Sequence, residues 1–87
     1  MDKNLKAKIV ENFRNTFLGF LRIKKNLGIN QFTNSETEAL LKKILSSTPV
    51  QDIQTIDKNH YFNCSKFNTV LTVNSYSLTI ITAKRMK

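Results

Sequence analysis

Three side chains in this sequence have the chemistry for proton transfer on a phosphodiester: His60, Tyr61 and Tyr76. The single histidine has an ordinary pKa near neutrality, which suits a general acid or base. RNA cleavage by 2′-hydroxyl attack also needs cations that stabilise the transition-state charge, and Lys or Arg provides them. We therefore take the three as candidate catalytic residues. The alternatives are a half-exposed histidine at a strand start, and tyrosines that pack across strands or stack on bases.

Basic residues predict an anionic partner. The chain has 14 Lys and Arg against 6 Asp and Glu, a net charge of +8. Residues 1–31 and 58–87 each carry an excess of +5 (7 − 2 and 5 − 0), whereas residues 32–57 carry −2 (2 − 4). If the first helix packs beside a sheet formed by the C-terminal half, the two basic blocks form one surface. We expect nucleic acid there, RNA rather than DNA, or alternatively an acidic protein. Lysines that only maintain solubility are the third interpretation.

The candidate nucleic-acid-binding residues lie in both basic blocks. They are Arg22, Lys24, Lys25, Lys58, Lys84 and Arg85.

Several classes of chemistry have no signal in the sequence. We find no metal-ligand spacing, no Gly-rich phosphate loop and no nucleophile elbow, so we expect no metal and no cofactor. The single cysteine, Cys64, cannot form an internal disulfide and is expected to be a buried, inert thiol. With no signal peptide and no apolar stretch of membrane-spanning length, the expected location is the cytoplasm, away from membranes.

The first half of the chain reads as helix. Apolar residues at every fourth position predict a helix over residues 5–27, either bent or divided at Gly19, and ending at Gly28. Ser35 and Glu38 have the spacing of a capping box for a further helix through residue 47. Pro49 then disfavours continuation of that helix.

The second half reads as strands over residues 53–56, 61–65, 69–74 and 78–83, which are rich in β-branched side chains. Alternation gives neither of the last two strands a clean apolar face, so the sequence does not assign the face that packs on the core. It does place Lys84 and Arg85 on opposite sides. We predict an α+β fold, a single domain over residues 1–87, in which two or three N-terminal helices pack on a three- or four-stranded antiparallel sheet.

Two stretches resemble a known family. Residues 16–27, TFLGFLRIKKNL, are similar to the opening signature T-x-L-G-x-x-R-I-K-x-N-L of short, uncharacterised bacterial proteins classed as a domain of unknown function. KNHY at residues 58–61 and LTVNSYSLTIITAK at 71–84 resemble its ending, K-N-x-Y followed by T-V-N-x-x-S-x-T-I-I-T-A. His60 stands where the family has Trp, and Lys84 where it has His. The resemblance implies a family and no activity.

Two functions remain open, and the sequence does not settle whether the protein is an enzyme. The leading hypothesis is an RNA-directed protein. Its most specific form is a metal-independent, toxin-type endoribonuclease of a mobile element. A distant likeness to small toxin and colicin-type ribonucleases adds only an analogy of fold. The alternative is a non-catalytic interaction protein, such as a phage-encoded inhibitor that binds an acidic protein or a nucleoprotein. A small domain with no nucleic-acid role is a third reading.

Overall fold

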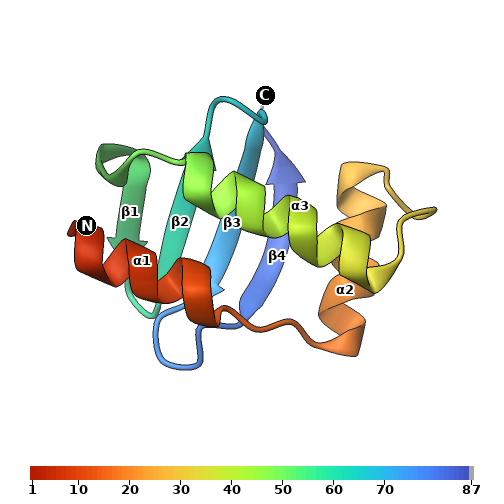
Figure 1. Ribbon diagram of the computed structural model, residues 1–87, viewed down its shortest axis with the longest axis horizontal. Helices are drawn as coiled ribbons and strands as arrows, with labels where there is room; N and C mark the ends of the chain where they lie inside the picture. The colour runs from red at the N-terminus through yellow and green to blue at the C-terminus, as the bar shows by residue number, and fades with distance from the viewer. Residues whose placement is uncertain (87) are drawn as a thin grey trace.

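The computed structural model describes residues 1–86 and confirms the α+β fold, with three helices before a four-stranded antiparallel sheet (Figure 1). The helices are α1 (Lys3–Asn12), α2 (Phe17–Leu27) and α3 (Asn34–Ser47), followed by a 3₁₀ turn at Val50–Asp52. The strands are β1 (Ile53–Ile56), β2 (Asn59–Cys64), β3 (Thr69–Asn74) and β4 (Ile80–Arg85), and they neighbour one another in that order. As predicted, every strand lies after Pro49.

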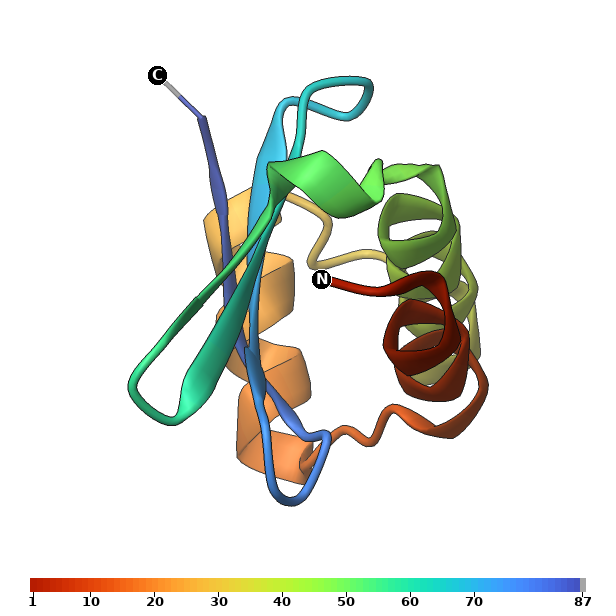
Figure 2. The same cartoon turned by 90° about the vertical axis from the view of Figure 1, so that its left-hand side faces the viewer.

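The helices occupy two different places around the sheet. Figure 2 shows the sheet edge-on, with α1 and α3 together on one face and α2 beside the β4 edge. The core lies between the sheet and the α1–α3 layer, and Cys64 is buried in it, as expected. Most of the opposite sheet face carries no helix (Figure 2). The core residues with no exposed surface include Ile9, Ile23, Leu41, Leu45, Phe62, Leu71 and Val73.

The break in the first helical segment falls at residues 13–16, so the predicted division at Gly19 is wrong. Arg14 leaves the helix because its backbone joins the sheet: its N–H donates to the carbonyl of Leu78 at 3.0 Å, and its carbonyl accepts from the N–H of Ile80 at 2.9 Å. Thr16 then starts α2 as the N-cap, accepting from the Gly19 N–H at 2.9 Å. Apolar residues continue at every fourth position across the break, so the sequence pattern does not reveal it.

The capping box of α3 is formed by Thr33 and Glu36, so the prediction of Ser35 and Glu38 is wrong. The Glu36 N–H donates to Thr33 Oγ1 at 3.0 Å, and the Thr33 N–H donates to Glu36 Oε1 at 2.8 Å. Both pairs have the correct spacing. The earlier start brings the hydroxyl of fully buried Thr37 to the Thr33 carbonyl at 2.9 Å, which satisfies a polar group in the core.

A β-bulge explains why alternation in the last strand gives no clean face. Val73 pairs with Ile80 and Thr72 pairs with Thr82, so Ile81 is an extra residue in β4. Because of this insertion, Ile80 and Ala83 both point into the core, although strict alternation places them on opposite faces. The core face of β3 is the one that carries Val73.

Polar side chains of α2 bond to the backbone of β4, the last strand of the sheet. Arg22 Nη1 donates to the Ile81 carbonyl at 3.5 Å, and Asn26 Nδ2 donates to the Ala83 carbonyl at 3.0 Å. Asn26 also lies 3.3 Å from Thr82 Oγ1. These bonds occupy backbone acceptors that an edge strand otherwise presents to other chains.

Arg85 fixes the other end of α2. Its guanidinium donates to the carbonyl of Leu27 at 3.1 Å, to Thr69 Oγ1 at 3.1 Å and to the carbonyl of Phe67 at 3.3 Å. It thereby satisfies a carbonyl in the last turn of α2 and ties that helix to β3. Lys84 points to the opposite sheet face, as predicted from the alternation.

We predict that Arg85→Met lowers the free energy of unfolding by about 1–2 kcal/mol, because three charge-assisted hydrogen bonds are lost while the aliphatic stem is kept. The matched control is Lys84→Met, which should change stability by no more than about 0.5 kcal/mol. Urea unfolding followed by circular dichroism measures both. Equal effects of the two substitutions would contradict the assigned role of Arg85.

Candidate nucleic-acid interface

The sheet face without helices contains a shallow hollow with a volume of about 370 Å³. One row of paired residues crosses all four strands: Gln54 pairs with Tyr61, Tyr61 with Thr72, and Thr72 with Thr82. Paired residues on neighbouring strands point to the same face, so these side chains form one surface. The remaining lining residues are Ile56, Asn63, Val70 and Lys84. We call this set of eight residues the open sheet face.

The open sheet face combines an aromatic ring with hydrogen-bonding groups and one cation. Tyr61 is half-buried on the second strand, and the exposed Lys84 extends the neighbouring row through Asn63 and Val70. A ring on a sheet stacks on bases whatever their identity, while hydroxyl and amide groups bond to base edges and a lysine contacts phosphate. This arrangement suits an extended single strand better than a duplex.

The structure does not bring the three candidate catalytic residues together. His60 points to the covered face and is 5% exposed, so the alternative of a half-exposed histidine is wrong. Tyr61 is the next residue in β2 and points to the open sheet face. Tyr76 lies in the turn between β3 and β4 and is 81% exposed.

The environment of His60 favours the neutral form of its imidazole. Burial lowers the pKa of His60 below the ordinary value of 6.5, and the positive amino group of Met1 lowers it further. Thr55 Oγ1 lies 2.7 Å from Nδ1 and satisfies that ring nitrogen. His60 thus acts as a hydrogen-bonded core residue.

The six candidate binding residues do not form one surface. Arg22 and Arg85 bond to backbone carbonyls at the α2–β4 contact. Lys24 Nζ donates to Asn34 Oδ1 at 2.6 Å and lies 6.0 Å from the centre of the Phe20 ring.

The other three candidates are exposed cations in separate places. Lys25 lies on α2, Lys84 lies on the open sheet face, and Lys58 lies in the turn between β1 and β2. Sequence reasoning did not identify the row of Gln54, Tyr61, Thr72 and Thr82, because the register between successive strands creates it.

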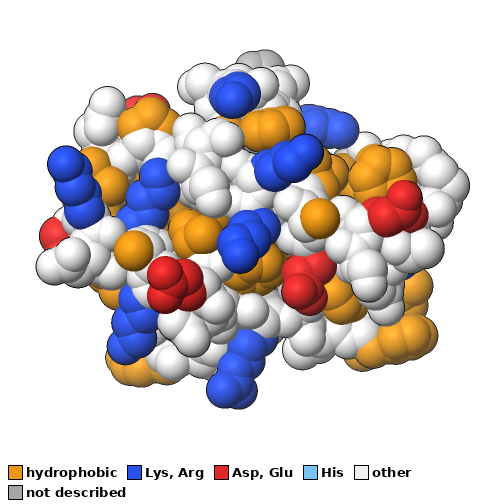
Figure 3. Space-filling view, in the orientation of Figure 1, with side chains coloured by type: hydrophobic (Ala, Val, Ile, Leu, Met, Phe, Trp, Pro, Cys, Tyr) orange, Lys and Arg blue, Asp and Glu red, His pale blue; other side chains and the backbone are white. Residues whose placement is uncertain are grey.

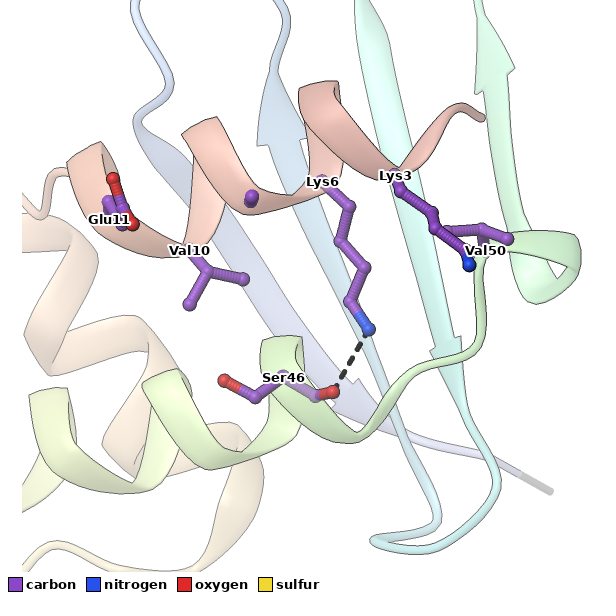
Figure 4. Close-up of a pocket in the computed structure, with 7 residues that line it drawn as sticks. Lys3, Lys6, Val10, Glu11, Ser46 and Val50 are labelled. Atoms are coloured by element: carbon purple, nitrogen blue, oxygen red, sulfur yellow. Dashed lines mark hydrogen bonds between the residues drawn. The ribbon is translucent and has the colours of Figure 1, made fainter.

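The helical face of the molecule is a weaker candidate. Figure 3 shows Lys and Arg side chains interspersed with Asp and Glu over α1 and α3, rather than a continuous basic patch. A groove of about 500 Å³ runs between these two helices (Figure 4). Lys6 crosses it to donate to the Ser46 carbonyl at 2.9 Å, which caps the last turn of α3. That lysine has a structural role.

Two other kinds of feature are absent from residues 1–86. That part of the chain contains no group of three or more His, Cys, Asp or Glu side chains arranged to hold a metal ion. Nor does any helix in it combine the length and the apolar composition required to cross a membrane.

Comparison with known proteins identifies the family. A family model described as a protein of unknown function, DUF3781, matches residues 7–84. The chain belongs to this family, as its two signature stretches suggested. No curated protein and no solved structure matches it.

We predict that stability falls as the pH decreases from about 7 toward 5.5, because the unfolded chain takes up a proton at His60 that the folded protein excludes. The slope from one such group is at most about 1.4 kcal/mol per pH unit. His60→Gln should flatten this slope, because glutamine does not titrate. Urea unfolding at several pH values measures the effect, and identical slopes for both proteins would contradict the burial-lowered pKa.

Proposed function

We propose that this protein binds single-stranded RNA on the open sheet face. The observation that carries the proposal is the row of Gln54, Tyr61, Thr72 and Thr82 across all four strands, with Lys84 in the neighbouring row. Tyr61 stacks on a base, the exposed amide of Gln54 bonds to a base edge or ribose, and Lys84 contacts a phosphate. The net charge of +8 favours approach of the polyanion.

The proposed activity is binding rather than cleavage. General acid–base cleavage requires two proton-transfer groups at one phosphodiester. His60 and Tyr61 point to opposite faces of β2, and the buried imidazole already bonds to Thr55. The metal-independent endoribonuclease expected from the sequence needs such a pair, and His60 with Tyr61 does not form one.

We predict that Tyr61→Leu weakens RNA binding by about 5- to 150-fold, because base stacking on a protein ring contributes about 1–3 kcal/mol. Lys84→Gln should weaken binding equally for all sequences and reduce the salt slope by about 1. Fluorescence anisotropy with a labelled 12-nucleotide single strand at several salt concentrations measures both quantities.

The matched control is Lys43→Gln, which removes an exposed cation from α3 on the far side of the sheet. It should have little effect beyond the change in net charge. Equal losses from Lys43→Gln and Lys84→Gln, or wild-type affinity that stays flat as salt rises, would contradict the proposal.

A second candidate function is favoured by the outer surface of α2. Phe17, Leu18 and Leu21 are 71%, 69% and 50% exposed and lie close together on this helix. We call these three residues the α2 apolar stripe. Large exposed apolar side chains that cluster on one element are typical of interaction sites. The bonds to β4 hold the helix rigid, so little conformational freedom is lost when a partner binds.

The charges around the α2 apolar stripe favour an acidic amphipathic helix as the partner. The exposed Lys25 follows Leu21 by one turn, so a basic side chain borders the apolar residues. A second copy of this chain would bring the same cations together, against a net charge of +8 on each copy. A partner with glutamates beside its apolar residues is complementary to both features.

We predict that the double substitution Leu18→Ser and Leu21→Ser leaves the melting temperature unchanged but abolishes binding of a synthetic 16-residue Leu/Glu amphipathic helix. The control is Ile56→Ser, which removes a comparably exposed (53%) apolar side chain from the β1 edge. Calorimetric titration with the Leu/Glu peptide and with a Leu/Lys counterpart measures the binding. Equal binding of the two peptides would contradict charge complementarity, and concentration-dependent dimers lost in the double variant would identify a second copy as the partner.

A further inference from the structure

A second hollow lies at one end of the sheet, between α1 and the turn that joins β3 to β4. Its volume is about 370 Å³, and it is separate from the open sheet face. Figure 1 shows this turn beside the C-terminal end of α1. The lining residues are Leu5, Lys8, Asn12, Arg14, Ser75, Tyr76, Ser77 and Leu78. Among these lining residues, two are basic and none is acidic.

The turn that forms one wall is held in a defined shape. Asn74 Oδ1 accepts hydrogen bonds from the backbone N–H groups of Tyr76 at 2.9 Å and Ser77 at 3.0 Å. The Ser75 N–H donates to the carbonyl of Lys58 at 2.8 Å, which ties this turn to the turn between β1 and β2. Leu78 has a φ of +59°, a region that a leucine seldom adopts, so the surrounding contacts determine its conformation.

The opposite wall is also fixed. The backbone of Arg14 bonds to Leu78 in the turn and to Ile80 at the start of β4, so the base of its side chain is anchored next to the turn. Lys8 is on α1, one turn before Asn12, whose side-chain amide donates to the Lys8 carbonyl at 2.9 Å. Both cations are exposed. Two separate elements thus present one positive charge each to the same hollow.

These groups match a particular kind of anion. A phosphomonoester carries nearly two negative charges at neutral pH, and an arginine and a lysine together balance it. Tyr76 is 81% exposed at the same hollow, where its ring has a free face for a base. The hydroxyl of Ser75 and the side-chain carbonyl oxygen of Asn12 also line the hollow and can bond to a ribose or a base edge, whereas the Ser77 hydroxyl bonds to Thr79 Oγ1 at 2.9 Å.

We propose that this hollow binds a nucleoside monophosphate group, with Lys8 and Arg14 on the phosphate and Tyr76 stacked on the base. The group has two sources, a free mononucleotide or the phosphorylated end of an RNA chain. The proposal does not depend on RNA binding at the open sheet face, because none of the residues that line one hollow lines the other.

The test is calorimetric titration of the full chain with AMP, adenosine and inorganic phosphate. AMP should bind most tightly, because it alone engages both the cations and the ring. Lys8→Gln and Arg14→Gln should each weaken AMP binding about 10-fold. Tyr76→Leu should weaken AMP binding about 5-fold or more and leave phosphate binding unchanged.

Three controls separate this site from the rest of the molecule. Lys43→Gln should leave AMP binding unchanged, and so should Tyr61→Leu and Lys84→Gln, which alter only the open sheet face. Thermal unfolding of each variant excludes loss of the fold as the cause. Absence of AMP binding to the wild-type protein, or equal weakening by Lys43→Gln and Lys8→Gln, would overturn the proposal.

A final pair of probes identifies the source of the group. A 5′-phosphorylated hexanucleotide that binds at least 10-fold more tightly than its 5′-hydroxyl form, with the difference lost in Arg14→Gln, supports an RNA end as the ligand. AMP binding that depends on Arg14, without any such difference between the hexanucleotides, supports the free mononucleotide.

Discussion

The attachment of α2 to the edge strand β4 is the interaction on which the rest of the structure depends. Arg22 and Asn26 bond to carbonyls of β4, and Arg85 bonds back to the carbonyl of Leu27 at the end of the helix. The helix also packs directly against β4, since a Cβ on Gly19 would lie in van der Waals contact with the Ile80 carbonyl, at 3.6 Å. The contact closes an exposed sheet edge and leaves α1 and α3 to cover one face.

The basic residues fall into two groups, because some of them bond to backbone carbonyls of the protein itself. The guanidinium groups of Arg22 and Arg85 act within the fold, and Lys6 does the same at the end of α3. The charge available to an external anion therefore comes from residues elsewhere, such as Lys8, Arg14 and Lys84. Net charge alone overstates how much of a small basic protein is free to contact nucleic acid.

The open sheet face and the sheet-end hollow have different chemistry. The first has a half-buried tyrosine among amide, hydroxyl and apolar side chains with a single lysine, which suits a strand recognised mainly by stacking. The second has two cations and an exposed tyrosine in a polar hollow, which suits a compact dianion attached to a base. The α2 apolar stripe lies on a third surface and is suited to a protein.

Local patterns in the sequence determined the element types, the switch from helices to strands at Pro49 and the position of Gly28, whose φ of +70° needs no Cβ. These three features depend only on residues that are close together in the sequence. Tertiary structure decided the break at Arg14, which follows from bonds to β4, and the choice of Thr33 over Ser35 as the cap. It also decided the core face of β4, because one inserted residue, Ile81, changes the direction of every side chain before it relative to those after it.

The candidate sites also depend on tertiary structure. Tyr61 and Lys84 are identifiable in the sequence as residue types, but only strand pairing places them on one surface. Lys8 and Tyr76 line one hollow only because α1 packs beside a turn that is more than sixty residues away in the sequence.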